Sequence, residues 1–473
     1  MLLYFSASNF RSIDETIELN LLSNNRLRHH KDHVKKPLKK DRSIGVLKTA
    51  VLYGSNAAGK SNIFKAVDHA LKIICGRYTP KKNLRQEPFK LNEETNNKSS
   101  DFYFEFSLNG LRSVYSFSYK ENFILKESLD VYGSKDKHTN IFCRERDGDK
   151  TSIKSDLLFP IDKKLALEKL SQEHDTSEDL SNIFNDFEVI SAMQRTPTDK
   201  LVLSEIATRN FSEFKNFSVN TINAVYDYFK TKMVVVYPES RYQGVSEHLK
   251  KESGKSSSFV KNLIDFNTGI SGLSSSSYDI SNMDSFFLET LEKGLKNSGN
   301  QFEIIELNDK HVSFYIDEET GELKAELLRT LHKNRLGKEI SFEVSEESDG
   351  TKRLFDLLPA ICLDSEIDET QHSGVTYFID EFNRSLHPAV ARKLLLQFLD
   401  KTANNNCQFI VSTHESELLD FKFLRRDEIY FVQKENDGAT ELYALDEYST
   451  RFDKDIRRAY LSGKFGAIPF EQV

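Results

Sequence analysis

Apolar and polar residues alternate with different periods along the chain, and these periods predict strands and helices. Residues 102–107 and 114–119 follow a pattern of alternation, and the Asn109-Gly110 pair between them is typical of tight hairpin turns. We therefore predict an antiparallel hairpin sheet in this region. Short apolar segments predict further strands at residues 2–6, 16–22, 49–53 and 233–237.

Helical spacing replaces alternation in other segments. In residues 60–74 the apolar side chains recur at helical spacing and Gly76 follows, so the pattern predicts a helix over this segment. Residues 160–232 also have helical spacing, but they carry charges all round, which indicates an arm or a separate lobe. Two serine-rich stretches, 253–258 and 271–277, are typical of flexible loops.

From Phe342 onward, strand and helix patterns alternate, as they do in α/β proteins. We predict strands at residues 377–380, 409–412 and 428–432 and a helix at 388–399. The predicted fold class is α/β, with a mixed sheet and an antiparallel β subdomain. We expect three parts: half of an α/β domain in residues 1–135, a mainly helical insert with a return strand in 136–335, and the other half of the domain in 336–473.

Composition restricts the class of protein. The 473 residues suffice for two or three domains, and 38% hydrophobic with 29% charged residues is typical of a soluble globular chain. No segment approaches the roughly 18 apolar residues of a membrane-spanning helix, and the first residues lack a signal-peptide pattern. We expect a cytoplasmic protein that binds no membrane. The four cysteines form no Cys-x-x-Cys pair, so they indicate neither a disulfide framework nor a zinc site.

The net charge of −8 disfavours general binding to polyanions, so any nucleic-acid contact would need a local basic patch. One candidate patch, residues 26–42, is rich in cations and histidines: Arg26, Arg28, Lys31, Lys35, Lys36, Lys39, Lys40, Arg42, His29, His30 and His33. The patch either contacts phosphate or, as is more common for such runs, is a solvated loop.

The strongest motif follows the predicted strand 49–53 and opens the predicted helix 60–74. It fits the P-loop pattern, in which backbone N–H groups and the helix N-terminus surround phosphates. Lys60 would neutralise the β- and γ-phosphates of ATP, and the Ser61 hydroxyl would bind Mg²⁺. The nucleotide-binding residues we predict here are Gly54, Ser55, Asn56, Ala57, Ala58, Gly59, Lys60, Ser61 and Asn62.

Two further motifs follow apolar strands near the C-terminal end. Asp380 and Glu381 end the strand that begins at Val375, which together with a P-loop indicates a Walker B motif. Asp380 suits the Mg²⁺ shell, and Glu381 would orient or deprotonate the attacking water. His414 follows the strand 409–412, where a P-loop sheet places a sensor of the γ-phosphate, although a lone histidine at a strand end is usually structural.

The order of these motifs resembles the ABC-type ATPases, in the branch that contains Rad50, the SMC proteins, RecF and the OLD nucleases. Within that branch the chain is most similar to the AAA15/AAA21 ATPases of phage defence, such as those of PARIS, retron-Septu and abortive-infection systems. The resemblance rests on the segments 9–13, 53–62, 87–92, 347–353 and 460–469, and it is weak over residues 135–330. It implies a P-loop ABC-ATPase head with bound ATP and Mg²⁺.

The resemblance assigns further roles by position. Ser348 and Gly350 stand where the family signature binds the γ-phosphate held by the other subunit, although Asp349 and Thr351 depart from the usual Ser-Gly-Gly-Gln. Ser385 and His387 would be D-loop residues, and His414 the switch histidine. Arg11 resembles a residue near the nucleotide. Either Gln86 or Gln194 could be the Q-loop glutamine that reaches the metal, and we favour Gln86 because it follows the P-loop helix.

The resemblance implies an Mg²⁺-dependent ATPase that switches an anti-phage defence system. Two copies would pair as a homodimer of heads or a higher homo-oligomer, and a neighbour-encoded nuclease or toxin would be the effector. A phage protein or DNA is a further possible partner. Too few residues follow His414 for a Toprim domain, so we expect no nuclease site in this chain. The alternatives are a DNA-repair or DNA-end-sensing ATPase like Rad50 or RecF, a non-hydrolysing scaffold, and a transporter subunit.

Overall fold

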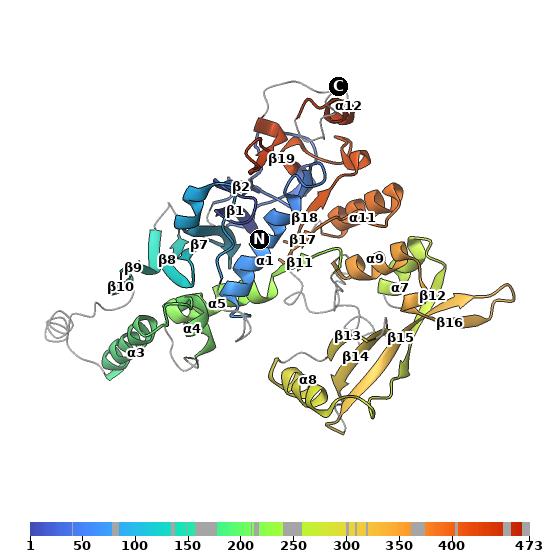
Figure 1. Ribbon diagram of the computed structural model, residues 1–473, viewed down its shortest axis with the longest axis horizontal. Helices are drawn as coiled ribbons and strands as arrows, with labels where there is room; N and C mark the ends of the chain where they lie inside the picture. Colours follow the sequence, from blue (N-terminus) through green and yellow to red (C-terminus); the bar gives the residue numbers. More distant parts are fainter. Residues whose placement is uncertain are drawn as a thin grey trace. The chain divides into compact units, whose positions relative to one another are not determined.

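The computed structural model describes most of the chain, in two compact units (Figure 1). The first unit comprises Met1–Val235, His372–Phe382 and Thr402–Val473, and the second comprises Val236–Gln371 and Asn383–Lys401. The described residues are 1–39, 41–77, 85–133, 138–148, 150–156, 177–209, 211, 217–239, 258–298, 302–307, 310–317, 320–360, 374–402, 405–447 and 456–465.

A seven-stranded antiparallel sheet forms one layer of the first unit, in the order β10-β9-β8-β7-β6-β1-β2. The predicted hairpin is β6–β7, and its turn has positive φ angles of 54° at Asn109 and 83° at Gly110, as a tight hairpin turn requires. The strands are β1 (Leu2–Ser8), β2 (Ile17–Asn20), β6 (Ser100–Leu108), β7 (Leu111–Lys120), β8 (Phe123–Tyr132), β9 (His138–Asp147) and β10 (Lys150–Lys154).

A six-stranded sheet, in the order β11-β17-β18-β5-β19-β20, forms the other sheet of this unit. Neighbouring strands from β17 to β19 run parallel, and β20 is antiparallel to β19. Every residue of β5, β17 and β18 is buried, as expected of parallel strands covered on both faces. The strands are β5 (Thr49–Tyr53), β11 (Met233–Val236), β17 (Thr376–Ile379), β18 (Gln408–Thr413), β19 (Ile429–Lys434) and β20 (Thr440–Ala444).

Helices complete the first unit. The helix α1 (Lys60–Ile74) has the predicted bounds, and Gly76 follows it with a φ of 62°. An aromatic cluster packs α5 against the seven-stranded sheet, since Phe106 stacks on Tyr228 with ring centroids 4.6 Å apart. The other elements are η1 (Lys31–His33), β3 (Val34–Lys35), β4 (Val46–Leu47), α3 (Ser177–Gln194), α4 (Val202–Thr208), α5 (Phe217–Thr231) and α12 (Ile456–Leu461). The part of the predicted helical segment at residues 160–176 lies outside the described residues.

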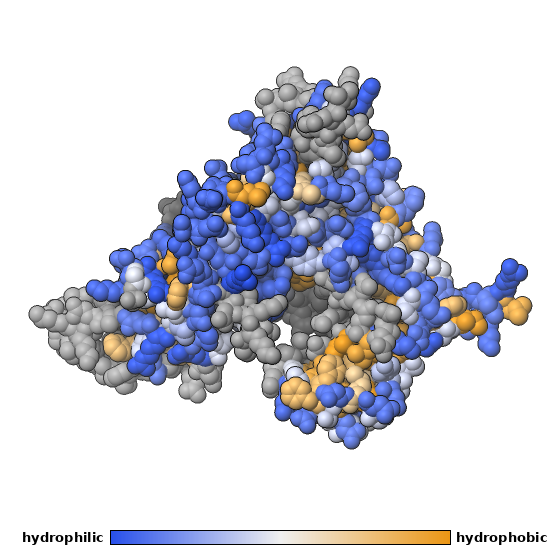
Figure 2. All heavy atoms as spheres, viewed as in Figure 1, coloured by the Kyte–Doolittle hydropathy of each residue, from blue (hydrophilic) through white to orange (hydrophobic). Residues whose placement is uncertain are grey.

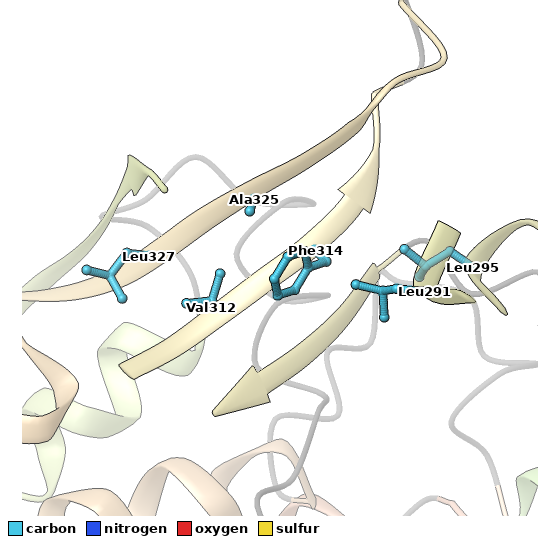
Figure 3. Packing of buried hydrophobic residues seen from close by; sticks show 6 residues of the cluster. All are labelled: Leu291, Leu295, Val312, Phe314, Ala325 and Leu327. Carbon is cyan, nitrogen blue, oxygen red and sulfur yellow. The ribbon is translucent and has the colours of Figure 1, made fainter. Parts of the chain in front are cut away.

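The second unit is built on an antiparallel sheet in the order β12-β15-β14-β13, with β16 also paired to β15. The helix α8 packs on this sheet through the buried residues labelled in Figure 3: Leu291, Leu295, Val312, Phe314, Ala325 and Leu327. The elements are α7 (Ser258–Asp265), β12 (Ile270–Ser277), α8 (Ser285–Ser298), β13 (Phe302–Leu307), β14 (Lys310–Ile316), β15 (Leu323–Lys333), β16 (Glu339–Glu343), α9 (Asp349–Leu357) and α11 (Pro388–Lys401).

The structure differs from the sequence prediction in two segments of the chain, residues 271–277 and residues 136–335. The serine-rich stretch 271–277, predicted as a flexible loop, is the strand β12, because its backbone pairs with β15 from Ile270 to Ser277. Residues 136–335, predicted as a mainly helical insert, contain strands as well as helices, and β9 and β10 continue the sheet of the first unit. The other serine-rich stretch lies outside the described residues up to position 257.

The surface is mostly polar in the view of Figure 2. Apolar atoms gather around α8 of the second unit, where the Phe286 side chain is 76% exposed. Within the described part of the chain, none of the helices combines the length and the apolar character that spanning a membrane requires.

Candidate functional site

The predicted P-loop connects the buried strand β5 to the helix α1. Gly59 precedes the helix with a φ of 110°, and a Cβ atom there would lie 2.0 Å from Thr440 Oγ1. A Cβ atom at Gly54 would lie 2.5 Å from the Val432 carbonyl oxygen. Both positions therefore require glycine, one for its backbone angle and both for the close approach of the β19–β20 pair.

Lys60 lies inside this loop. Lys60 is only 8% exposed, and its Nζ donates hydrogen bonds to the carbonyl oxygens of Gly54 at 2.6 Å and Ser55 at 2.8 Å. Burial lowers the pKa of Lys60, while the charges of Asp380 and Glu381 oppose that shift. The ammonium thus faces the concave side of a loop whose backbone geometry suits a phosphate group.

The two predicted acids follow β17. Asp380 is 3% exposed and its Oδ1 accepts a hydrogen bond of 2.5 Å from Ser412 Oγ at the end of β18. The backbone N–H of Glu381 donates to the same Ser412 oxygen at 2.9 Å. Glu381 itself is half-buried and has a φ of 45°, which turns the chain sharply after the strand.

Sheet order brings the P-loop, the acids and His414 to one edge. The strand β18 lies between β17 and β5, with Ile379 opposite Val411 and Thr413 opposite Tyr53. Because these strands are parallel, the residues that follow them meet at the carboxyl edge of the sheet, where ligands bind in open α/β sheets. His414 is exposed at this edge.

A chain of hydrogen bonds connects the P-loop to Ser12 and to the start of β20. Asn62 Nδ2 donates to Ser12 Oγ at 2.7 Å, Ser12 Oγ lies 2.7 Å from Thr440 Oγ1, and Thr440 Oγ1 donates to the Ala58 carbonyl at 3.2 Å. Each hydroxyl has one proton, so Ser12 donates to Thr440 in this chain. No local sequence pattern indicates Ser12, Thr440 or Ser412, since their contacts join distant segments of the chain.

A cleft of about 800 Å³ opens beside the start of α1, and it brings together Arg11, Gln86 and Asn62. Arg11 is exposed, and its Nε donates to Glu87 Oε2 at 2.7 Å. The amide of Gln86 is engaged by the backbone, since Nε2 donates to the Lys98 carbonyl at 2.8 Å and Oε1 accepts from the Glu121 N–H at 3.1 Å. A role at a metal would require Gln86 to leave these partners.

The alternative glutamine, Gln194, is an exposed residue at the end of α3. It does not line the cleft beside α1.

The signature and D-loop positions meet within the second unit. Ser348 precedes α9 and its Oγ accepts a hydrogen bond of 3.2 Å from the Thr351 N–H, so it caps the helix. A Cβ atom at Gly350 would lie 2.8 Å from the Ser385 carbonyl, and Ser385 has a φ of 61°. Ser348, Ser385 and His387 are exposed. The residues predicted to form the signature and the D-loop therefore lie together on the surface of this unit.

The first unit suits ATP and Mg²⁺ on structural grounds. Its glycine-rich loop precedes a 15-residue helix, and the loop holds an amine rather than an acid. The buried carboxylate of Asp380 and the half-buried Ser61 offer oxygen atoms, which Mg²⁺ prefers as ligands. A strand, a P-loop, a helix and strand-end acids in a parallel sheet define the class of P-loop ATPases.

Comparison with known families specifies this class. A family model described as "AAA domain, putative AbiEii toxin, Type IV TA system" matches residues 50–420, which is more than half of the chain. The chain belongs to this AAA_21 family. The match confirms the resemblance to the AAA21 ATPases and, with the observed sheets, the predicted α/β fold class.

The solved structures that match the chain include SMC heads and RecF. An SMC head bound to the C-terminal winged-helix domain of ScpA matches with a TM-score of 0.37, 12% identity, and coverage of 94% of this chain and 98% of that chain. The SMC head domain from Thermotoga maritima has a TM-score of 0.31 with the same identity and coverages. The recombination mediator protein RecF-ATPrS in the RecFOR pathway has a TM-score of 0.30, also with 12% identity and coverages of 94% and 98%. These TM-scores are low, so the fold assignment rests on the sheet order and the family match. No curated protein matched the chain.

Proposed function

We propose that this ATPase hydrolyses ATP with Mg²⁺ at the carboxyl edge of the six-stranded sheet and uses the cycle as a conformational switch. The observation that supports the proposal best is the contact of Ser412 Oγ with both Asp380 Oδ1 and the Glu381 N–H. This contact holds two neighbouring acids in different surroundings, since Asp380 is buried and Glu381 is half-buried. Such a division of surroundings is typical of a metal ligand beside a general base.

Each residue would have a separate task. The P-loop N–H groups and Lys60 would bind the phosphates, and Ser61 and Asp380 would hold Mg²⁺, which supplies positive charge against the phosphate oxygens. Glu381 would accept a proton from the attacking water, and His414 would contact the γ-phosphate. Arg11 and Gln86, which line the cleft beside α1, would face the nucleotide from its other side.

The signature residues belong to the other structural unit. We propose that Ser348 and Gly350 contact the γ-phosphate bound to the P-loop of a second copy of the chain. The exposed N-terminus of α9 supports this proposal, since a helix N-terminus attracts negative charge and Ser348 is exposed there. A homodimer of heads, or a higher homo-oligomer, would then close when ATP binds its shared interface more tightly than the separate heads.

The closing and opening of paired heads would control a partner effector. We propose a neighbour-encoded nuclease or toxin as the effector and anti-phage defence as the setting, with a phage protein or DNA as the trigger and the cytoplasm as the location. The family description, which includes a putative AbiEii toxin and a Type IV TA system, supports this setting. The defence role rests on family analogy, since fold alone does not determine function.

The hydrolytic role of Glu381 is tested by Glu381→Gln. Loss of a general base costs about 10²–10⁴-fold in rate, so we expect phosphate release to fall at least about 100-fold while ATP binding is retained. Glu417→Gln, which changes an exposed glutamate beyond His414, is the matched control and should hydrolyse ATP normally. Equal phosphate release by Glu381→Gln and the wild type would remove Glu381 from this role.

The partner is tested with the same variant. Glu381→Gln expressed with the native gene neighbourhood and purified with ATP and Mg²⁺ should retain its effector, which mass spectrometry identifies. A bound nuclease or toxin supports the defence switch.

A DNA-repair ATPase is the second candidate, and one observation favours it. Several cations of the 26–42 segment are exposed and available to phosphate: Arg26, Arg28, Lys31, Lys36 and Lys39. Nucleic acid that co-purifies without a protein partner, detected from the ultraviolet absorbance ratio, would favour this candidate over the defence switch.

A further inference from the structure

Two histidines and an aspartate gather in the basic segment 26–42, away from the P-loop motifs. The short 3₁₀ helix η1 carries His33, and His30 immediately precedes it. The two imidazoles stack, with centroids 4.9 Å apart and an interplanar angle of 22°. Asp32 lies beside them, with Oδ2 3.8 Å from His33 Nε2.

Both histidines have a partner on the ring nitrogen that faces the protein. His33 Nδ1 lies 2.9 Å from Oε1 and 3.1 Å from Oε2 of Glu428, a fully buried residue immediately before β19. His30 Nε2 lies 3.0 Å from the carbonyl oxygen of Phe421. A carbonyl only accepts, so His30 Nε2 donates this hydrogen bond, which makes Nδ1 the nitrogen through which a neutral imidazole would bind a metal. Metal-binding histidines characteristically donate their second nitrogen to a carboxylate or a carbonyl in this way.

We propose that His30, Asp32 and His33 bind a divalent transition-metal ion, for which Zn²⁺ is the best-fitting probe. One ligand atom from each residue lies within 4.8 Å of the other two. Tetrahedral Zn²⁺ at its usual bond lengths places ligand atoms about 3.3 Å apart, so modest side-chain rotations would close the site. Two imidazoles and one carboxylate are a ligand set that Zn²⁺ accepts.

The backbone of the turn is held in place for this arrangement. His30 has the left-handed angles φ 49° and ψ 55°, which are unusual for a residue with a side chain. The Lys48 N–H donates to the His33 carbonyl at 2.9 Å and fixes the end of the turn. The Asp32 side chain is 72% exposed, so the fourth coordination position would open to water. A bound ion would link the turn to the distant segment 421–428.

One buried cation opposes a metal here. Lys48 is fully buried, and its Nζ has no hydrogen-bond partner among the residues the structure describes. The carboxylates whose charges act on Lys48 are those of the proposed ligand Asp32 and of Glu428, the partner of His33. Removal of the amine should therefore strengthen metal binding.

The test is a calorimetric titration of Zn²⁺ into the full-length, tag-free, chelator-treated protein without nucleotide or Mg²⁺. We expect one Zn²⁺ equivalent that is lost in His30→Ala and in Asp32→Ala, two partly or fully exposed positions where the change leaves no large cavity. His29→Ala is the matched control, because His29 is exposed and its backbone carbonyl, which the substitution keeps, accepts from Arg425. With Co²⁺ in place of Zn²⁺, the wild type and His29→Ala should show the visible bands of a tetrahedral site.

Two further variants separate metal binding from structural effects. Glu428→Gln removes the carboxylate behind His33 and should weaken Zn²⁺ binding by about 10–100-fold. Lys48→Met should strengthen it. Zn²⁺ should raise the Tm of the wild type and leave that of His30→Ala unchanged. The proposal is overturned if the wild type binds no Zn²⁺, or if His30→Ala and Asp32→Ala bind as many equivalents as His29→Ala. These readouts do not involve ATP hydrolysis, so they are independent of the proposed switch.

Discussion

Ser412 lies near the end of β18, the strand that leads to His414, and its hydroxyl contacts both acids. In the sequence it is one serine in an apolar strand, and nothing in its neighbours indicates a role. In the structure its hydroxyl has a single proton, which it gives to Asp380 Oδ1, and it accepts the N–H of Glu381. Ser412 therefore positions the carboxylate of Asp380 and the backbone of Glu381 together.

Ser412→Ala should disturb this positioning. Loss of a residue that orients a metal ligand typically costs 10–100-fold in metal affinity or activity, so we expect about that loss in ATP hydrolysis at low Mg²⁺. Part of the loss should be recovered at high Mg²⁺, because the defect lies in metal binding. Initial rates over a range of Mg²⁺ concentrations measure this. Ser416→Ala, at a nearby half-buried serine, is the control. A uniform loss at every Mg²⁺ concentration would contradict the positioning role.

The contiguous motifs of the candidate site can be recognised in the sequence, whereas the distant residues that contact them cannot. The P-loop from Gly54 to Ser61 is recognisable because its phosphate chemistry depends on neighbours in sequence. The contact between Gly59 and Thr440 joins segments 381 positions apart (440 − 59), so no local pattern reports it. The contacts of Ser412 and Ser12 also join segments that are distant in sequence, so no local pattern indicates them.

At the scale of elements, α1 connects the P-loop to the antiparallel sheet through His69. Its Nε2 lies 2.6 Å from the Tyr119 hydroxyl of β7, and its ring packs against Phe10 at 5.0 Å and Phe102 at 6.1 Å between centroids. Burial among these aromatic rings lowers the pKa of His69 to about 4 from its usual 6.5. The helix that carries the P-loop lysine is thus docked by an imidazole that remains neutral at neutral pH.

This docking should make stability depend on pH. Between pH 4 and 6.5 the unfolded chain binds a proton at position 69 and the folded protein does not, so the free energy of unfolding falls as pH decreases through this window. The loss should reach about 2 kcal/mol at pH 5. Thermal denaturation at pH 7 and pH 5 measures it, with His69→Gln as the comparison, since glutamine keeps a hydrogen-bonding group without the titration. An equal decrease in Tm for both proteins would contradict this prediction.

Strands and helices with a clear period were predictable, whereas β12 was not. The helix α1 has strong amphipathic spacing and a glycine after its end, and its predicted bounds of 60–74 are confirmed. Residues 271–277 consist mainly of serines, which have no apolar alternation, and they form a strand because β15 offers a paired edge. Tertiary pairing thus determined the conformation of this segment, as is common for strands.

At the scale of the whole molecule, the nucleotide motifs are divided between the two units. The P-loop and the acids that follow β17 belong to the first unit, and Ser348, Gly350 and Ser385 belong to the second. The sequence predicted this set of motifs in the order in which they occur along the chain. It did not predict the division between units. Residues 372–382 and 402–473 belong to the first unit, whereas residues 383–401 between them belong to the second.

The division makes shared sites testable by mixing two inactive variants. Lys60→Ala removes the P-loop amine, and Ser348→Arg places a bulky cation at the exposed start of α9. If each site combines the P-loop of one copy with the signature of another, a mixed dimer contains one site that has both wild-type Lys60 and wild-type Ser348. Half of the dimers are mixed at equal concentrations, and each has one intact site of two, so ATP hydrolysis should recover to about a quarter of the wild-type rate.

The mixture must be compared with each variant alone at the same total concentration, after exchange of subunits without nucleotide. A second mixture that combines Lys60→Ala with Glu381→Gln is the control, because both changes lie in the first unit and both impair the same half of a shared site. In that mixed dimer each site contains one of the two defects, so the rate should stay near zero. Recovery in the first mixture alone requires sites that are completed between copies, whereas no recovery in either mixture would mean that Ser348 does not act across a pair of heads.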